Sequence, residues 1–148
     1  MTCLRYPPDI GGTEAAARVL AHALVATGHE VTVVTGATIA HRSQSTEHGV
    51  VVRRFPLPTG RGSGACYVAQ ATAVAIGAGR HDVVHAHMAS APAVAAIVVG
   101  ALWRTPVVVK PSSGAGASGG NLADVLERRG GRWRVALLRR LVGSFVAV

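Results

Sequence analysis

The sequence predicts an α/β domain built on a doubly wound parallel sheet. Short valine-rich runs, each bounded by turn residues, alternate along the chain with longer segments of helical composition. The runs mostly lack alternating polar residues, as expected for strands that are buried on both faces. With 148 residues, 49% of them hydrophobic and only 15% charged, the chain can bury a core of one domain. Regular alternation of strand and helix is typical of a parallel sheet.

The valine-rich runs and the segments between them define the expected elements. Strands are expected at residues 31–35, 50–55, 82–85, 106–110 and 144–148. Helices are expected at residues 13–27, 65–78, 89–103 and 122–142, the last with a break at Gly130-Gly131. The segment 112–120 is rich in glycine and serine and is expected to form a loop directly after a strand.

The first helix has the clearest boundary signals. Thr13 can cap its N-terminus, and Gly28 stands where a glycine commonly follows a helix. Its apolar face is expected from Val19, Leu20, Ala23 and Leu24.

The beginning of the chain is short for such a fold. Only Met1 to Arg5, which include Thr2, Cys3 and Leu4, precede the segment that starts at Tyr6 and continues with two prolines. That is too few residues for the first strand, which lies at the centre of a doubly wound sheet. The other end stops inside an apolar run. We therefore expect residues 1–148 to form a truncated domain whose first strand is missing.

Composition argues against several classes of protein. Cys3 and Cys66 are far apart and lack metal-ligand spacing, so neither a disulfide framework nor a zinc site is expected. The uncharged stretch of residues 88–103, which is rich in alanine and valine, is shorter than a membrane span and is interpreted as a buried helix. No signal peptide opens the chain, so the expected location is the cytoplasm. The segment before the first helix, residues 6–14, lacks the G-x-G-x-x-G fingerprint, and no P-loop occurs in the chain, which disfavours a nicotinamide or P-loop site.

Two adjacent glycines precede the first helix. Gly11 and Gly12 leave the backbone amides accessible, and the helix dipole favours an anion at this end. Paired glycines before a helix also occur simply as a tight turn.

Five landmarks stand in a characteristic order along the chain. They are Pro7-Pro8-x-x-Gly11-Gly12-x-Glu14, Gly28-His29-Glu30-Val31, His48-Gly49-Val50 before Arg53, His81-Asp82-Val83-Val84-His85-Ala86-His87, and Pro106-Val107-Val108. Together they make the chain resemble the N-terminal half of a family 4 glycosyltransferase. The resemblance covers nearly the whole chain.

This resemblance implies a GT-B architecture, in which two Rossmann-like domains face each other across a cleft. It implies transfer from a nucleotide-sugar donor to a sugar or lipid-linked acceptor hydroxyl, with retention of anomeric configuration and without a cofactor or bound metal. The N-terminal domain would mainly receive the acceptor. The C-terminal domain, which would hold most of the donor, is expected to be missing here, so the chain alone should be inactive unless a donor domain is supplied in cis or in trans.

The resemblance also assigns residues. Gly11 and Gly12 would face the donor phosphates with Glu14 beside them, and Lys110 would be a further anion partner. His87 and Ser112 would lie on the acceptor side. Many family members place a histidine after the strand that ends at residue 110, whereas this chain continues with lysine, proline and serines. No catalytic residue is therefore assigned.

Each of these residues also has an ordinary structural interpretation. Glu14 can simply complement the helix dipole, and Lys110 can be a solvated charge at a strand end. His87 can be a neutral histidine held in the core, and this interpretation is preferred for His85.

Arginines are concentrated near the end of the chain. The stretch from Arg128 to Leu141 is basic and amphipathic, so it can contact an anionic membrane surface at the inner face of the membrane. A surface helix with solvated arginines is the alternative. Nucleic-acid binding is not expected, because the remaining arginines are scattered and the aromatic residues form no stacking platform. A non-catalytic, anion-binding or membrane-surface module is the alternative to a glycosyltransferase domain.

Overall fold

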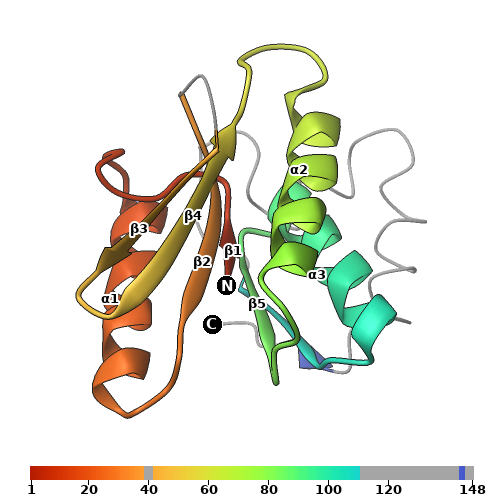
Figure 1. Cartoon of the computed structure of the whole chain (residues 1–148). Coiled ribbons are helices and arrows are strands. Elements are labelled where there is room, and N and C mark those ends of the chain that lie inside the picture. Colours follow the sequence, from red (N-terminus) through yellow and green to blue (C-terminus); the bar gives the residue numbers. More distant parts are fainter. Residues whose placement is uncertain (39–41, 111–143, 146–148) are drawn as a thin grey trace.

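The computed structural model describes residues 1–38, 42–110 and 144–145, and within them it contains one sheet and three helices (Figure 1). The strands are β1 (Thr2–Cys3), β2 (Thr32–Ala37), β3 (Ser43–Glu47), β4 (Val50–Pro56), β5 (Val84–His87), β6 (Val107–Lys110) and β7 (Ser144–Phe145). The helices are α1 (Gly12–Ala26), α2 (Ser63–Gly77) and α3 (Ala91–Trp103). The strand order is β3-β4-β2-β1-β5-β6-β7, and every neighbouring pair except β3 and β4 is parallel. The predicted Rossmann-like α/β fold is confirmed.

Most predicted elements form within a few residues of their expected positions. The runs predicted at 31–35, 50–55, 82–85 and 106–110 become β2, β4, β5 and β6, and the run at 144–148 contributes β7. The helices predicted at 13–27, 65–78 and 89–103 are α1, α2 and α3. The helix predicted at 122–142 and the loop at 112–120 fall outside the residues that the structure describes.

The first strand is present, contrary to the expectation that it is missing. Thr2 pairs with Val34 of β2 on one side and with Ala86 of β5 on the other, so β1 occupies the centre of the sheet. Because β1 has pairing partners on both sides, two residues suffice to define it. A strand of this length is too short to produce a hydrophobic pattern in the sequence.

The strand β3 is the other element that the sequence did not predict. Its sequence, Ser-Gln-Ser-Thr-Glu, has no apolar residue, and it pairs antiparallel with β4 at the edge of the sheet. A polar edge strand is a common protection against pairing with other chains. It makes the sheet mixed, while the remaining six strands are parallel.

The helices cover the two faces of the sheet unequally, with α1 on one face and α2 and α3 on the other (Figure 1). The α1 side of the core contains Ala17 and Ala21 against Val33, Val50 and Val52. The larger cluster on the opposite face gathers apolar side chains of α2 and α3 against the sheet. Its largest fully buried members are Tyr67, Phe55, Val99 and Val109.

The connections explain this arrangement. From β1 the chain passes through α1 to β2, in one direction across the sheet, whereas β5 passes through α3 to β6 in the other direction. Right-handed crossovers running in opposite directions place their helices on opposite faces. The sheet is therefore doubly wound, as predicted, and the direction of winding changes between β1 and β5.

The N-terminus of α1 differs from the prediction, whereas its C-terminus agrees with it. The helix begins at Gly12 with Gly11 as its N-cap and without a side-chain cap, so Thr13 does not cap it. At the C-terminus Gly28 has φ of 89°. Its amide donates to the Val25 carbonyl at 2.9 Å, and the His29 amide donates to Leu24 at 3.0 Å. These two hydrogen bonds form a Schellman motif, which requires a residue with positive φ.

The apolar face predicted for α1 is correct only in part, since Leu24 packs against the core but Val19 and Ala23 are exposed. Val19 is 67% exposed, and the fully buried positions are Ala17 and Ala21. Small residues lie at the interface because the helix packs closely on the sheet, which leaves the larger Val19 on the outside. The interpretation of residues 88–103 as a buried helix is confirmed, since most of the apolar residues of α3 are buried. Among the described residues, no helix is long and apolar enough to cross a membrane.

Candidate functional site

The centre of the sheet contains the point at which the winding direction changes. There β1 and β5 are neighbours, and the loops that follow them lead to α1 and α3 on opposite faces. In open α/β sheets such a switch point leaves a crevice at the carboxyl ends of the strands, where ligands bind. The residues predicted to bind substrate come from this edge of the sheet.

The loop after β1 brings the two glycines to the start of α1. Gly12 is exposed, and the carboxylate of Glu14 folds back over Gly11. A Cβ atom at Gly11 would overlap this carboxylate, which would have to shift, whereas the φ of Gly11 is extended and suits any residue. The N-cap side chain offers no acceptor to the first amides of the helix. These amides and the helix dipole favour a negative group, which Glu14 supplies in the described structure.

The adjacent strands β5 and β6 supply a histidine and a lysine in register. His87 is the last residue of β5 and pairs with Lys110, the last residue of β6. The amide of Met88, which has φ of 86°, donates to the Lys110 carbonyl at 2.9 Å. This hydrogen bond holds the two strand ends together beyond the regular ladder.

Alternation along β5 decides which face His85 and His87 occupy. Val84 and Ala86 belong to the core cluster beneath α2 and α3. Because successive strand residues point to opposite faces, His85 and His87 lie on the other face, the face that carries α1. The histidines and the N-terminus of α1 therefore share one face of the sheet at its switch point.

The two imidazoles are buried next to each other. Their ring centroids are 4.6 Å apart in an edge-to-face arrangement, and His87 is only 2% exposed. Burial lowers the pKa of both His85 and His87 to about 4, and the positive charge of Lys110 contributes to both shifts. Both rings are consequently neutral at pH 7.

Neither ring has its hydrogen bonds satisfied. Nδ1 of His85 and Nε2 of His87 are buried and have no hydrogen-bond partner among the described residues. A buried polar atom without a partner is uncommon and costs stability, so it requires an explanation. The preferred interpretation of His85 as a histidine satisfied by core hydrogen bonds is not supported at Nδ1.

Two residues that the sequence analysis did not single out support this region. Tyr67 of α2 is fully buried, and its hydroxyl donates to the Cys3 carbonyl at 2.7 Å, which ties α2 to β1. Arg54 of β4 donates to the Pro7 carbonyl at 2.8 Å and so holds the loop that leads to Gly11. Neither residue belongs to a recognisable motif. Tyr67 and its partner Cys3 are 64 positions apart in the sequence, and Arg54 and Pro7 are 47 positions apart.

The structure thus gathers Gly11, Gly12, Glu14, His87 and Lys110 at the carboxyl edge of neighbouring strands β1, β5 and β6. Ser112 and the stretch from Arg128 to Leu141 lie outside the described part of the chain. Within that part, no three histidine, cysteine or acidic side chains are close enough together to hold a metal ion. The arrangement offers helix amides and one ammonium group to an anion, with a neutral imidazole beside them.

Comparison with known proteins gives one result. The model of the glycosyl transferase 4-like domain matches residues 11–148. No curated protein matches the chain. The matched region extends from the glycine pair through β7, and thus includes every described site residue. The chain therefore belongs to the glycosyl transferase 4-like domain family.

Proposed function

We propose that this chain is the acceptor-side domain of a retaining glycosyltransferase that moves a sugar from a nucleotide-sugar donor to a hydroxyl of a sugar or lipid-linked acceptor. The observation that carries the proposal is the position of the site residues. The glycine pair, His87 and Lys110 come from different segments and lie at the carboxyl edge of the neighbouring strands β1, β5 and β6, where the winding direction changes. Ligands bind at this edge in open α/β sheets, and the N-terminus of a helix favours a phosphate group there.

The two charged features at the edge have complementary roles. The first amides of α1 and the Lys110 ammonium attract the donor phosphates, whose negative charge increases as the bond to the sugar breaks. For the phosphates to approach Gly11, the Glu14 carboxylate has to move away from it. The carboxylate is the far end of the flexible Glu14 side chain, so this movement costs little free energy.

His87 is proposed to orient the acceptor. Its neutral ring can accept a hydrogen bond from a hydroxyl at one nitrogen and donate at the other. The unpartnered Nε2 supports this role, because a polar ligand group would satisfy it. No reaction step is assigned to His87, since proton transfer by this ring would require a pKa closer to 7.

Transfer also requires a second domain to hold the nucleotide. We propose that the chain is inactive alone and becomes active with a donor domain in the same or another polypeptide. No metal or cofactor is included in the proposal, and the nucleotide sugar acts as a co-substrate.

The test is to combine residues 1–148 with the C-terminal donor domain of a GT-B glycosyltransferase, confirm the complex by size-exclusion chromatography, and measure nucleoside diphosphate release with a sugar acceptor. We expect no release from the chain alone and turnover from the complex, with the product's anomeric configuration retained by NMR. A stable complex that binds donor and acceptor but transfers no sugar would contradict the proposal.

Point variants locate the activity. Lys110→Gln removes the ammonium and is expected to lower kcat/KM about tenfold or more, as loss of a charge-assisted hydrogen bond does. His87→Gln is expected to raise KM for the acceptor more than for the donor. Arg80→Gln is the matched control, because it also removes one positive charge but lies in the loop before β5, at the opposite edge of the sheet. Equal losses in Lys110→Gln and Arg80→Gln would point to net charge in place of a defined site.

A further inference from the structure

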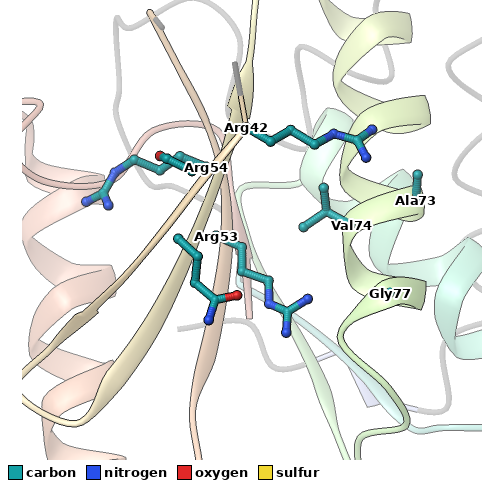
Figure 2. Close-up of a pocket in the computed structure, with 8 residues that line it drawn as sticks. Arg42, Arg53, Arg54, Ala73, Val74 and Gly77 are labelled. Atoms are coloured by element: carbon teal, nitrogen blue, oxygen red, sulfur yellow. The ribbon is translucent and has the colours of Figure 1, made fainter. Parts of the chain in front are cut away.

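A second cationic region lies away from the switch point, in a groove between the β3–β4 hairpin and α2 (Figure 2). The groove has a volume of about 300 Å³. On one side it is lined by Arg42, Ser43, Gln44, Arg53 and Arg54, and on the other by Ala73, Val74 and Gly77. The apolar wall comes from α2, and the polar wall comes from the hairpin.

The two arginines of the hairpin that extend toward α2 have no acidic partner in the described structure. Figure 2 shows Arg42 and Arg53 on the side of the hairpin that faces α2, whereas Arg54 points away from it. Among the described residues, the ion pairs are Arg5 with Asp9 and Arg54 with Glu47. Arg42 makes one side-chain hydrogen bond, to the amide oxygen of Gln70 at 2.7 Å. The groove therefore holds two positive charges that no described carboxylate neutralises.

Arg53 is also incompletely hydrogen-bonded. Its Nε atom is buried and has no partner among the described residues. An arginine donor removed from water without an acceptor is unfavourable, and the cost is larger than for a neutral donor. An oxygen ligand placed in the groove would remove this cost.

The neighbouring side chains narrow the chemistry of such a ligand. Gln44 lies directly across from Arg53 in the β3–β4 ladder, and Ser43 precedes it. An amide and a hydroxyl together with two guanidinium groups provide more hydrogen-bond donors than one carboxylate can accept. A phosphate group carries up to two negative charges and several acceptor oxygens, and guanidinium groups match its geometry. We propose that this groove binds a phosphate group through Arg42 and Arg53.

This site is distinct from the proposed transfer site. Phe55, two residues after Arg53 on the same strand, packs in the core cluster with α2, so Arg53 lies on the α2 face of the sheet. The glycine pair and His87 lie on the face that carries α1. The phosphate can belong to a soluble compound or to a lipid headgroup, and both share the same recognition chemistry.

The test follows the arginine Nε–H signals of the full chain by ¹⁵N NMR during titration with inorganic phosphate, with sodium chloride at equal ionic strength as the reference. Phosphate is expected to shift the signals of Arg53 and Arg42 saturably, and chloride is not. Arg53→Gln should weaken phosphate binding about tenfold or more. Arg53→Lys, which keeps the charge but loses the planar fork, should be intermediate.

Arg18→Gln is the matched control, because Arg18 is exposed on α1, on the other face of the sheet, and it should change the phosphate affinity less than about twofold. Circular dichroism verifies that each variant is folded. If folded Arg53→Gln and Arg42→Gln bind phosphate as the unmodified chain does, or if chloride produces the same shifts, the proposal is wrong. Because His87 and Lys110 remain unchanged in these variants, failure of this proposal leaves the transfer proposal intact.

A second experiment distinguishes a lipid headgroup from a soluble compound as the source of the phosphate. Vesicles containing phosphatidic acid and vesicles of phosphatidylcholine alone are mixed with the chain, and co-sedimentation is measured. If the phosphate is a lipid headgroup, binding to the phosphatidic acid vesicles should exceed binding to the neutral vesicles and decrease in Arg53→Gln. If the phosphate belongs to a soluble compound, Arg53→Gln should leave vesicle binding unchanged but still weaken the phosphate binding that the Arg42 signal reports.

Discussion

Arg54 of the β3–β4 hairpin and the two histidines of the switch point differ in whether their polar atoms have hydrogen-bond partners. In the hairpin, Arg54 donates to the hydroxyl of Ser45 at 2.7 Å, to the carboxylate of Glu47 at 2.8 Å and to the Pro7 carbonyl at 2.8 Å. Its charge is paired and its donors are used. At the switch point, His85 and His87 are buried with one nitrogen each that no described residue contacts.

This difference separates structural polar groups from groups available to a ligand. A polar network whose members satisfy one another fixes the chain in place. A buried polar atom without a partner destabilises the fold, so it marks a position where a ligand or an ordered water can bind. The same contrast exists within one strand, because Arg53 and Arg54 are consecutive residues on opposite faces of β4. Arg54 is fixed by Glu47, and Arg53 is not paired with any described residue.

The largest effect is expected from removing the support beneath the switch point. Tyr67→Ala leaves a cavity between α2 and the sheet and removes the hydrogen bond to Cys3 of β1. Truncation of a large buried aromatic residue costs about 3–5 kcal/mol. Urea unfolding of the variant should show this loss, and the chain can fail to fold at all. Tyr67→Phe keeps the ring and should cost only about 1 kcal/mol. Equal stability of Tyr67→Ala and the unmodified chain would show that α2 does not hold β1.

The second effect concerns the pH window in which the switch point loses stability. Burial lowers the pKa of His85 and His87 to about 4 from a usual value of 6.5. Between these values the unfolded chain binds more protons than the folded chain, so stability decreases as the pH falls from 6.5 toward 4. The slope approaches about 1.4 kcal/mol per pH unit for each histidine that titrates only on unfolding.

Unfolding free energies measured from pH 4 to pH 8 for the unmodified chain and for His87→Gln test this prediction. The variant should lose less stability on acidification, because glutamine does not titrate. His85 and His81 retain part of the slope, since burial also lowers their pKa values. Parallel curves for the two proteins would show that His87 is not buried in its neutral form.

The sequence predicted the strands β2, β4, β5 and β6 because they are valine-rich and bounded by turn residues. It predicted the glycine pair, His87 and Lys110 because these residues end strands or begin a helix, and the direction of the chain places such positions at one edge. It did not predict β1 or β3. Both lack a hydrophobic pattern and exist only because a neighbouring strand pairs with them.

The supporting contacts could not be predicted either. Arg54 and Tyr67 act through hydrogen bonds to backbone carbonyls of Pro7 and Cys3. Every residue has a backbone carbonyl, so no side-chain motif in the sequence predicts such a contact. The burial of Ala17 and Ala21 in place of larger residues is likewise a result of how closely α1 approaches the sheet. Helical spacing alone does not determine that distance.

A third prediction compares the two arginines of β4. Arg54→Gln removes the charge-assisted hydrogen bonds to Glu47 and Pro7 and should cost about 1–2 kcal/mol, because the pair is partly exposed and screened by solvent. Arg53→Gln should have an effect within about 0.5 kcal/mol, since no described partner is lost. Denaturant unfolding of the two variants measures the difference. The comparison between the two faces of β4 fails if Arg53→Gln is the more destabilising variant.

The pH dependence of stability also distinguishes the Arg54 side of the hairpin from the histidines. Burial raises the pKa of Glu47, but the hydrogen bonds from Arg54 and Ser45 outweigh this effect and hold the pKa below its usual value of 4.5. A carboxylate with a lowered pKa contributes stability that is present above the unfolded value and is lost as the pH falls through the folded value. The hairpin should therefore lose this contribution below pH 4.5, under more acidic conditions than the histidines. In Arg54→Gln the loss below that pH should be smaller.

The smallest effect is expected at the glycine pair. Gly11→Ala brings a Cβ atom into the position of the Glu14 carboxylate, which can rotate away at a cost of about 0.5–1 kcal/mol. Glu14→Ala should remove this cost, so that the double variant is more stable than the sum of the single changes predicts. A double-mutant cycle by thermal unfolding measures the coupling. Additive effects would mean that the carboxylate does not lie over Gly11 in solution, and Glu14 would then leave the helix amides free for an anion without having to move.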